Sequence, residues 1–169
     1  MEPGFTGKEK ENVSMDPKKT PPIENPDIGY MITNISYGIR QYFDAAFVDH
    51  DVTYPQSRVL TRLFSQLGKG DVNQRNLEYA LGIKASSVSS LVRNLEQKGF
   101  ITCERLPQDT RNKRILLTEK GLKLQNLLDR SRDRAEEEMT RGLTPEQVEV
   151  FRTCLKQVME NLEQNASQA

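Results

Sequence analysis

Apolar residues recur with the spacing of an α-helix near both ends of the chain. From Asp27 to Phe47 they fall three or four residues apart, and Asp27 itself is a suitable N-cap. A second such stretch runs from Val148 to Leu162, after a Thr144–Gln147 capping box with proline at the first helical position. Both stretches predict amphipathic helices. Their apolar stripes can pack within one domain, but their length favours a second surface, such as that of a partner subunit.

Shorter helical patterns lie between these two. A capping box at Thr53–Gln56 opens one helix, and Asn73 is the cap of a second helix that Gly82 ends. A third begins almost at once and covers Lys84–Gln97. Two short helices joined by a tight turn that contains glycine predict a helix-turn-helix.

The helix at Lys84–Gln97 has two unlike faces. One face is apolar and must be buried; it carries Val88, Leu91, Val92 and Leu95. The opposite face carries hydroxyls, amides and one guanidinium but no carboxylate: Ser86, Ser90, Arg93 and Gln97, flanked by Ser89 and Asn94. Such a set suits phosphates and base edges in a major groove. The alternative is an ordinary serine-rich surface helix.

Strand patterns follow directly. Phe100–Leu106 and Arg114–Leu117 alternate apolar and polar residues, and a loop at Pro107–Asn112 joins them as a hairpin. Thr118 then opens one long helix to Met139. The expected fold is mainly α with a small β-hairpin, a winged helix-turn-helix with a helical region on either side.

Charge changes this picture only locally. The chain has 24 basic and 24 acidic residues, so its net charge is zero. Residues 84–114, however, contain seven basic and three acidic residues, a net charge of +4. This concentration is what an electrostatic footprint for nucleic acid on a neutral protein requires.

The remaining chemistry excludes several classes of function. Cys103 and Cys154 lack the spacing of a zinc site or a disulfide framework and fit a reducing cytoplasm. Cys103 alternates with Ile101 toward the core, which favours a structural thiol over a redox sensor. His50 is the only histidine, and there is no glycine-rich phosphate loop and no nucleophile with its base. We therefore expect no catalytic residues, no metal and no cofactor. No apolar run spans a bilayer, and the N-terminus lacks the apolar core of a signal peptide.

Residues 109–121 carry a more specific signal. Their sequence, DTRNKRILLTEKG, resembles the D-x-R-x5-L-T-x-x-G signature of the MarR (multiple antibiotic resistance regulator) family of winged-helix repressors. Leu95–Ile101 is similar to that family's L-E-x-x-G-L-V, and Thr53–Leu60 also matches, so that the resemblance covers Ile28–Leu162. It implies a homodimer whose terminal helices interleave and whose two wings grip a palindromic DNA operator.

The resemblance also implies a division of the chain. We expect a disordered tail at 1–26, an N-terminal dimerisation helix at 27–52, a winged helix-turn-helix DNA-binding domain at 53–118, C-terminal dimerisation helices at 119–165 and a disordered end at 166–169. The tail is rich in charged residues and proline and has too few apolar residues to offset the entropy of ordering.

Specific DNA contacts follow from the same resemblance. Arg111 would enter the minor groove from the wing tip with Asp109 orienting it, since a guanidinium suits the negative potential of a narrow groove. Lys113 and Arg114 would contact phosphate. The recognition-helix positions are Ser86, Ser87, Ser89, Ser90 and Arg93. Lys84–Ala85 stands where the family has Ser-Pro, so the usual cap is absent while Lys84 gains a possible phosphate contact. As alternatives, Asp109 and Arg111 form only a turn pair, and Arg93 pairs with Glu96 or Gln97.

Relatives bind aromatic acids near the junction of the dimer helices and the winged domain. The polar and aromatic residues expected there are Tyr37, Arg40, His50, Tyr54 and Arg58, with core packing as the alternative for the two tyrosines. We expect a sequence-specific transcriptional regulator, a homodimeric repressor released by a small effector such as an aromatic or phenolic molecule. The alternatives are a winged-helix protein-interaction module without DNA binding and a cysteine-based redox-sensing regulator.

Overall fold

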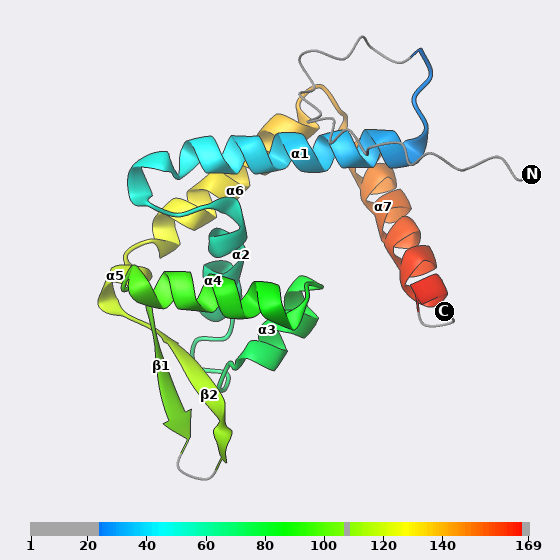
Figure 1. The fold of residues 1–169 in the computed structure, drawn as a ribbon. Coiled ribbons are helices and arrows are strands. Elements are labelled where there is room, and N and C mark those ends of the chain that lie inside the picture. Colours follow the sequence, from blue (N-terminus) through cyan, green and yellow to red (C-terminus); the bar gives the residue numbers. More distant parts are fainter. Residues whose placement is uncertain (1–23, 107–108, 167–169) are drawn as a thin grey trace, which may run out of the picture. The chain divides into compact units, whose positions relative to one another are not determined.

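The computed structural model describes residues 24–106 and 109–166 and confirms a mainly helical fold with a two-stranded antiparallel hairpin (Figure 1). Its elements, in order, are α1 (Ile28–Ala46), the 3-10 turn η1 (Val48–His50), α2 (Tyr54–Ser65), α3 (Gln74–Leu81), α4 (Ala85–Gln97), β1 (Ile101–Leu106), β2 (Asp109–Leu117), α5 (Glu119–Leu122), α6 (Gln125–Thr140) and α7 (Pro145–Ala166). The expected tail at 1–26 and end at 166–169 lie outside the described residues, apart from residues 24–26 and Ala166. Among the helices described, none is both long and apolar enough to span a bilayer.

The chain divides into two units within α1, one reaching Arg40 and the other starting at Gln41. Helix α1 begins where the sequence predicted, because the Tyr30 N–H donates to Asp27 Oδ1 at 2.8 Å. None of the residues of α1 is buried, although its apolar positions keep a helical period. This helix therefore gains little from the burial of its own apolar side chains.

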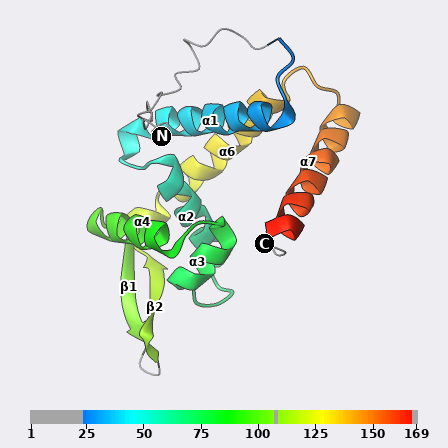
Figure 2. The ribbon, with the colours of Figure 1, turned by 45° about the vertical axis from the view of Figure 1, so that its right-hand side comes forward.

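The core of the second unit forms where α2, α3 and α4 pack against the base of the hairpin and the start of α6. In Figure 1 and Figure 2 the hairpin projects away from these three helices. The buried side chains are those of the predicted apolar faces: Val59, Leu60, Leu63, Leu77, Val88, Val92, Leu95, Ile101, Ile115, Leu124 and Leu128. Burial of this set fixes the orientation of α4, because its opposite face must then meet solvent.

The helix-turn-helix is formed by α3 and α4. Asn73 caps α3 as predicted, and the side chains of Asn73 and Asn76 exchange hydrogen bonds with each other's backbone N–H groups, each at 2.9 Å. Gly82 ends the helix in the left-handed region, with φ of 63°. Helix α4 then starts after Lys84, one residue later than expected, and Lys84 supplies no side-chain cap.

The carboxyl end of α4 is a Schellman turn. The Phe100 N–H donates to Leu95 O at 3.0 Å, and the Gly99 N–H donates to Glu96 O at 2.9 Å. Gly99 has φ of 74°, a conformation that favours glycine. Leu95 and Phe100 are both buried, which adds the hydrophobic contact that accompanies this motif.

The hairpin corrects one prediction. Strand β2 begins at Asp109, whereas the sequence placed residues 109–112 in a loop and began the strand at Arg114. The register changes at the outer end: Arg105 pairs with Lys113, but Leu106 pairs with Asp109. The sequence of residues 109–112 shows no strand pattern because this end of the hairpin projects beyond the core. Its backbone pairs without any need for apolar side chains.

The helix expected from Thr118 to Met139 is also corrected. Thr118 is the cap, accepting from the Gly121 N–H at 3.1 Å, but α5 ends at Leu122 and α6 starts only at Gln125. Between them Leu124 N–H donates to Gly121 O at 3.0 Å, a bond that spans three residues and tightens the chain. Leu124 and Leu128 lie in the core as their apolar spacing predicted, but the uninterrupted spacing did not reveal the break.

Gly121 lies directly against the turn that ends α4. A Cβ atom added at Gly121 would stand 2.2 Å from the carbonyl oxygen of Phe100, a separation no real contact allows. The same oxygen accepts from the Thr118 N–H at 3.1 Å, and the Thr118 hydroxyl donates to Gly99 O at 2.7 Å. The family signature at Leu117–Gly121 thus has a structural reason, since it holds α5 onto the end of α4.

We expect Gly121→Ala to destabilise the protein by about 2–4 kcal/mol, because backbone cannot move aside as a flexible side chain can. Urea unfolding followed by circular dichroism measures this change. The matched control is Gly38→Ala, because Gly38 lies inside α1 with no neighbouring atom within 4 Å of the added Cβ. That variant should be neutral or more stable by about 0.5–1 kcal/mol. Equal effects of the two substitutions would contradict the close contact.

Candidate nucleic-acid interface

The outer face of α4 is exposed and free of carboxylate along its first two turns. Ser86 and Ser87 lie in the first turn and Ser90 one turn later, and all three are exposed. The Ser90 hydroxyl donates to Ser86 O at 3.1 Å, which leaves its oxygen able to accept. Lys84 is exposed ahead of them. Because the first N–H groups of a helix point outward and carry partial positive charge, this end is suited to a phosphate.

Ser89 differs from its neighbours. It is half-buried, and its hydroxyl donates to Gln74 Oε1 of α3 at 3.0 Å. This bond ties the two helices of the helix-turn-helix together. The predicted DNA contact of Ser89 is untested, and its hydroxyl hydrogen is already used within the protein.

Arg93 is exposed on the same face as Ser86 and Ser90. The alternative prediction paired it with Glu96 or Gln97, but the Glu96 carboxylate instead accepts from the Cys103 N–H at 3.1 Å. Arg93 forms no ion pair with the residues that the structure describes. Its guanidinium is therefore available to a ligand.

The wing places two basic residues opposite each other. Arg105 of β1 and Lys113 of β2 are register partners, and both are exposed. Like charges in this position repel, which costs stability in the free protein. A phosphate between them would relieve that repulsion. Arg105 was not among the predicted site residues, because its partner can be identified only from the strand register.

The residues with the most specific sequence signal are Asp109 and Arg111. Their backbone belongs to β2, but their side chains lie outside the described residues. The prediction that Arg111 enters a minor groove, with Asp109 orienting it, is therefore untested.

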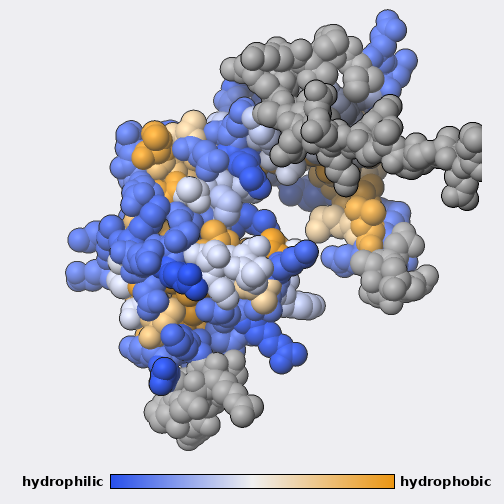
Figure 3. All heavy atoms as spheres, viewed as in Figure 1, coloured by the Kyte–Doolittle hydropathy of each residue, from blue (hydrophilic) through white to orange (hydrophobic). Residues whose placement is uncertain are grey.

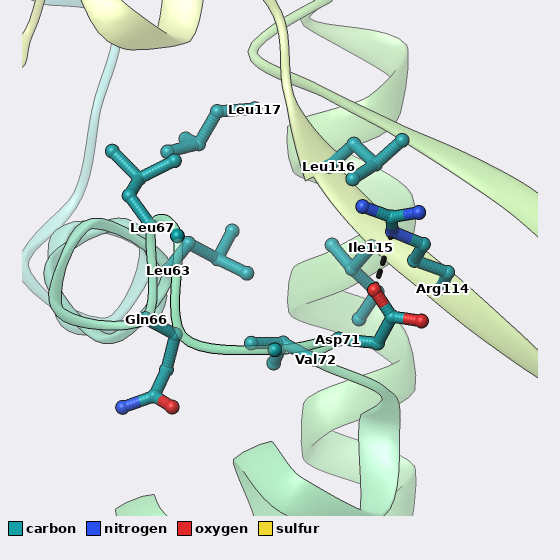
Figure 4. A pocket seen from close by; sticks show the side chains of 11 residues that line it. Leu63, Gln66, Leu67, Asp71, Val72, Arg114, Ile115, Leu116 and Leu117 are labelled. Atoms are coloured by element: carbon teal, nitrogen blue, oxygen red, sulfur yellow. Dashed lines mark ion pairs between the residues drawn. The ribbon is translucent and has the colours of Figure 1, made fainter.

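Arg114 lies at the base of the wing, where it is half-buried. Its Nε is 2.8 Å from Asp71 Oδ1, and Figure 4 shows this ion pair beside the apolar side chains of Ile115 and Leu116. Next to it, Ile115 N–H donates to Val72 O at 2.8 Å, so the segment before α3 adjoins the hairpin. Arg114 thus anchors the wing, and its predicted phosphate contact would compete with Asp71.

These contacts reduce the apparent basicity of residues 84–114. Two of the basic residues, Lys98 and Arg114, form ion pairs with Asp51 and Asp71 from earlier in the chain. Within residues 84–114, the described basic side chains that face solvent without such a partner are Lys84, Arg93, Arg105 and Lys113. These four, together with the first turn of α4, make up the candidate interface.

The predicted effector residues are divided between the two units. Tyr37 and Arg40 belong to the first, and His50, Tyr54 and Arg58 to the second. The Tyr54 ring stacks on Phe43 with centroids 5.0 Å apart. Arg58 donates to Leu81 O at 3.3 Å, while His50 is exposed on η1. The contacts of Tyr54 and Arg58 serve packing, in line with the core alternative for Tyr54.

The cavity shown in Figure 4 does not involve any of these five residues. It lies between the turn after α2 and strand β2, is lined by Leu63, Leu67, Val72 and Ile115 among others, and has a volume of about 80 Å³. Ligand sites for drug-sized molecules are usually several times larger. Within the part of the chain that is described, no three His, Cys, Asp or Glu side chains gather as a metal site.

Cys103 is half-buried and packs against the core, as predicted for a structural thiol. Burial, together with the nearby Glu96 carboxylate, raises the pKa of its thiol to about 11. The thiol therefore stays protonated at neutral pH, which disfavours the redox-sensing alternative for this residue.

Comparison with known proteins identifies relatives that cover most of the chain. Residues 52–113 match the model of the MarR family. The uncharacterised HTH-type transcriptional regulator YybA of Bacillus subtilis (strain 168) is 28% identical over 141 residues, which are 82% of this chain and 91% of YybA. YdcH, an uncharacterised HTH-type transcriptional regulator of the same organism, is 31% identical over 98 residues, 57% of this chain and 67% of YdcH. Among solved structures, the S. aureus MepR–DNA complex has a TM-score of 0.77 and 29% identity, covering 82% of this chain and 99% of that one.

We expect Cys103 to react slowly with iodoacetamide. A pKa near 11 instead of its usual 9 lowers the thiolate fraction at about pH 8 by roughly a hundredfold. Mass spectrometry of the Cys154→Ser variant, folded and in denaturant, measures the two rates. Alkylation of the folded protein as fast as that of the denatured protein would contradict a protonated structural thiol.

Proposed function

Because the chain belongs to the MarR family and is a DNA-binding transcriptional regulator, we propose that it acts as a homodimeric repressor that binds a palindromic operator and is released by a small effector. MarR-family proteins are transcriptional regulators and not enzymes, which agrees with the absence of catalytic motifs in the sequence. MepR, a relative of the same fold, has been crystallised with DNA.

The observation that carries this proposal is the exposed face of α4 beside a basic wing. A phosphate at the first turn of α4 would meet outward N–H groups and the hydroxyls of Ser86 and Ser87. Arg93 lies two turns further along, within reach of base edges if α4 enters a major groove. Arg105 and Lys113 on the hairpin would meet the flanking backbone. Each of these side chains faces solvent in the free protein, so binding does not require it to leave an internal partner.

Dimerisation is supported by the uncovered apolar residues of the terminal helices. On α7 the exposed fractions are 64% for Val150, 44% for Phe151 and 66% for Leu162, and Figure 3 shows apolar surface over this helix. On α1 the same holds for Ile28, with 64% exposed, and Ile35, with 48%. Soluble monomers rarely leave such stripes in water. We propose that each stripe is covered by a second copy of the chain.

A hollow on α7 adds to this argument. Val150, Phe151 and Cys154 line it with the stems of Glu146 and Gln147, and its volume is about 400 Å³. Side chains of a single helix cannot close a cavity, so the hollow is an open recess that a partner's apolar side chains would fill. A dimer formed in this way also brings two α4 helices to one DNA molecule.

Release by an effector follows from the geometry of a dimer on DNA. Two half-sites one helical turn apart, roughly 34–36 Å, accept one separation of the recognition helices. A molecule that binds better to a different separation weakens DNA binding by its differential affinity. We propose an aromatic or phenolic effector near Tyr37, Arg40, His50, Tyr54 and Arg58. Of these, His50 is exposed, so its side chain is accessible to such a ligand.

We expect site-specific binding to the intergenic DNA upstream of the protein's own gene. The affinity should fall steeply with salt, because each phosphate contact releases counterions and contributes about −0.9 to the slope of log K against log salt. Fluorescence anisotropy at two salt concentrations measures this slope. Arg111→Ala should lower the affinity about tenfold or more with an unchanged circular dichroism spectrum. An unchanged affinity in that variant would rule out the wing contact, and equal binding of scrambled duplex would rule out a specific operator.

We expect Leu155→Asp to dissociate the dimer. Leu155 is 37% exposed on α7, and a carboxylate buried there without a partner would weaken association by about a hundredfold or more. Sedimentation velocity over a range of protein concentrations measures the dissociation constant. Lys156→Asp is the matched control, because it places the same carboxylate on the next residue, which is polar and exposed. Equal dissociation of both variants, or of neither, would contradict an interface on α7.

A further inference from the structure

We propose that Lys98 is a positioning residue for DNA binding: its contact with Asp51 holds the carboxyl end of α4 at the start of α2 and so sets the angle of the recognition helix. The inference rests on the proposed function, in which α4 enters the major groove. Lys98 is one of the basic residues of the segment 84–114, but its ammonium contacts the protein and not the DNA.

The Lys98 ammonium bridges two parts of the chain that are far apart in sequence. Its Nζ lies 2.8 Å from both the carbonyl oxygen and Oδ1 of Asp51, and 3.3 Å from Oε1 of Gln56. Gln56 is buried, with only 4% exposed, and the same Oε1 accepts from the Thr53 N–H at 3.1 Å. The ammonium therefore joins the end of α4 to the cap of α2.

The turn that receives Lys98 is itself fixed. Asp51 has φ of 54° and ψ of 37°, a left-handed conformation that is uncommon for any residue other than glycine. Phe47 and Val52 on either side of it are buried, with 1% and 5% exposed. The ammonium contacts the carbonyl oxygen and Oδ1 of Asp51 in this conformation. Lys98 thus connects α4 to a point anchored in the core and not to a free loop.

A second lysine holds the same residue from the opposite side. Lys120 Nζ donates to the carbonyl oxygen of Lys98 at 2.7 Å and lies 4.4 Å from the centre of the Phe100 ring. A cation at this end of a helix also interacts favourably with the helix dipole. Lys98 is therefore held through its side chain by the start of α2 and through its backbone by α5.

The geometry separates this role from a phosphate contact. An ammonium has three donors; that of Lys98 donates hydrogen bonds to Asp51 O and Gln56 Oε1 and forms an ion pair with Asp51 Oδ1. A phosphate would have to displace one of them. The side chain is also only 26% exposed. Loss of Lys98 should then leave unchanged the number of phosphates that lysine and arginine side chains neutralise, which is the number that sets the salt slope.

The length of α4 turns a small change at one end into a large one at the other. Its 13 residues span roughly 20 Å. A tilt of about 10° at Lys98 would displace the first turn by about 3 Å, which is the length of a hydrogen bond. Ser86 and Ser87 would then miss their contacts, although non-specific attraction to the backbone would persist.

We expect Lys98→Met, which keeps the apolar stem, to lower specific affinity about tenfold or more. The probe is a duplex that the wild-type protein selects from a random pool, compared with a scrambled duplex. Affinity for the scrambled duplex and the salt slope should both be unchanged. Lys113→Met is the matched control, because loss of a phosphate contact should reduce the slope by about one and weaken both duplexes. A reduced slope for Lys98→Met, or an unchanged specific affinity, would overturn the proposal.

A double-mutant cycle tests the contact between Lys98 and Asp51. Asp51→Asn removes the charge while asparagine tolerates the left-handed conformation. We expect Asp51→Asn to lose less specific affinity than Lys98→Met does. The double variant should lose no more than Lys98→Met alone. Additive losses would show that the two residues act separately and would overturn the proposal.

Amide hydrogen exchange tests, without DNA, whether Lys98 holds the carboxyl end of α4. In Lys98→Met the Gly99 and Phe100 amides, which close the end of α4, should exchange severalfold faster than in the wild type, while the melting temperature shifts by only a few degrees. Unchanged exchange at these amides would overturn the proposal that Lys98 holds the end of α4, even if an operator is found. Failure of the wild-type protein to select any duplex would refute the proposed function instead, and the exchange result would still decide whether Lys98 holds the helix.

Discussion

The arrangement of the DNA-binding unit depends on the close approach of Gly121 to the carbonyl oxygen of Phe100. A Cβ atom at Gly121 would be 2.2 Å from that oxygen, and the same oxygen accepts a hydrogen bond from Thr118. Both sides of the contact are backbone, so neither can change rotamer to make room. Glycine leaves room for this approach, and the hydrogen bonds from Thr118 to Phe100 O and Gly99 O hold it in place. Because Phe100 ends the Schellman turn, this constraint sets where α4 stops and where the wing begins.

The sequence predicted those elements whose signals are local. The caps at Asp27, Asn73 and Thr118 and the glycines after α3 and α4 depend on neighbouring residues, and the structure places each helix end within a residue or two of them. The break between α5 and α6 and the full extent of β2 depend on partners distant in sequence. The break accompanies the approach of Gly121 to Phe100, and the outer end of β2 pairs its backbone with β1 beyond the core. No apolar period reports such contacts.

The candidate site was likewise predictable where its signal was local and not where it depended on contacts distant in sequence. Helical period alone assigned Ser86, Ser90 and Arg93 to the outer face of α4, where the structure exposes them. It could not separate the basic residues that face solvent from those that hold the fold. Lys98 and Arg114 were counted with the DNA-binding charge, yet both pair with aspartates from earlier in the chain. Arg105 was missed, because only strand register places it opposite Lys113.

This division of the basic residues has a consequence for a protein of zero net charge. Non-specific affinity for DNA comes almost entirely from phosphate contacts, so a neutral chain with few outward cations binds random sequence weakly. Discrimination then depends on base contacts and shape, both of which demand that α4 enter the groove at one angle. Cations used inside the domain, such as Lys98, add nothing to general attraction. In the role proposed for Lys98, such a cation stabilises the one orientation in which the few outward groups would meet their targets together, so that part of the basic character of the segment would serve specificity and not affinity.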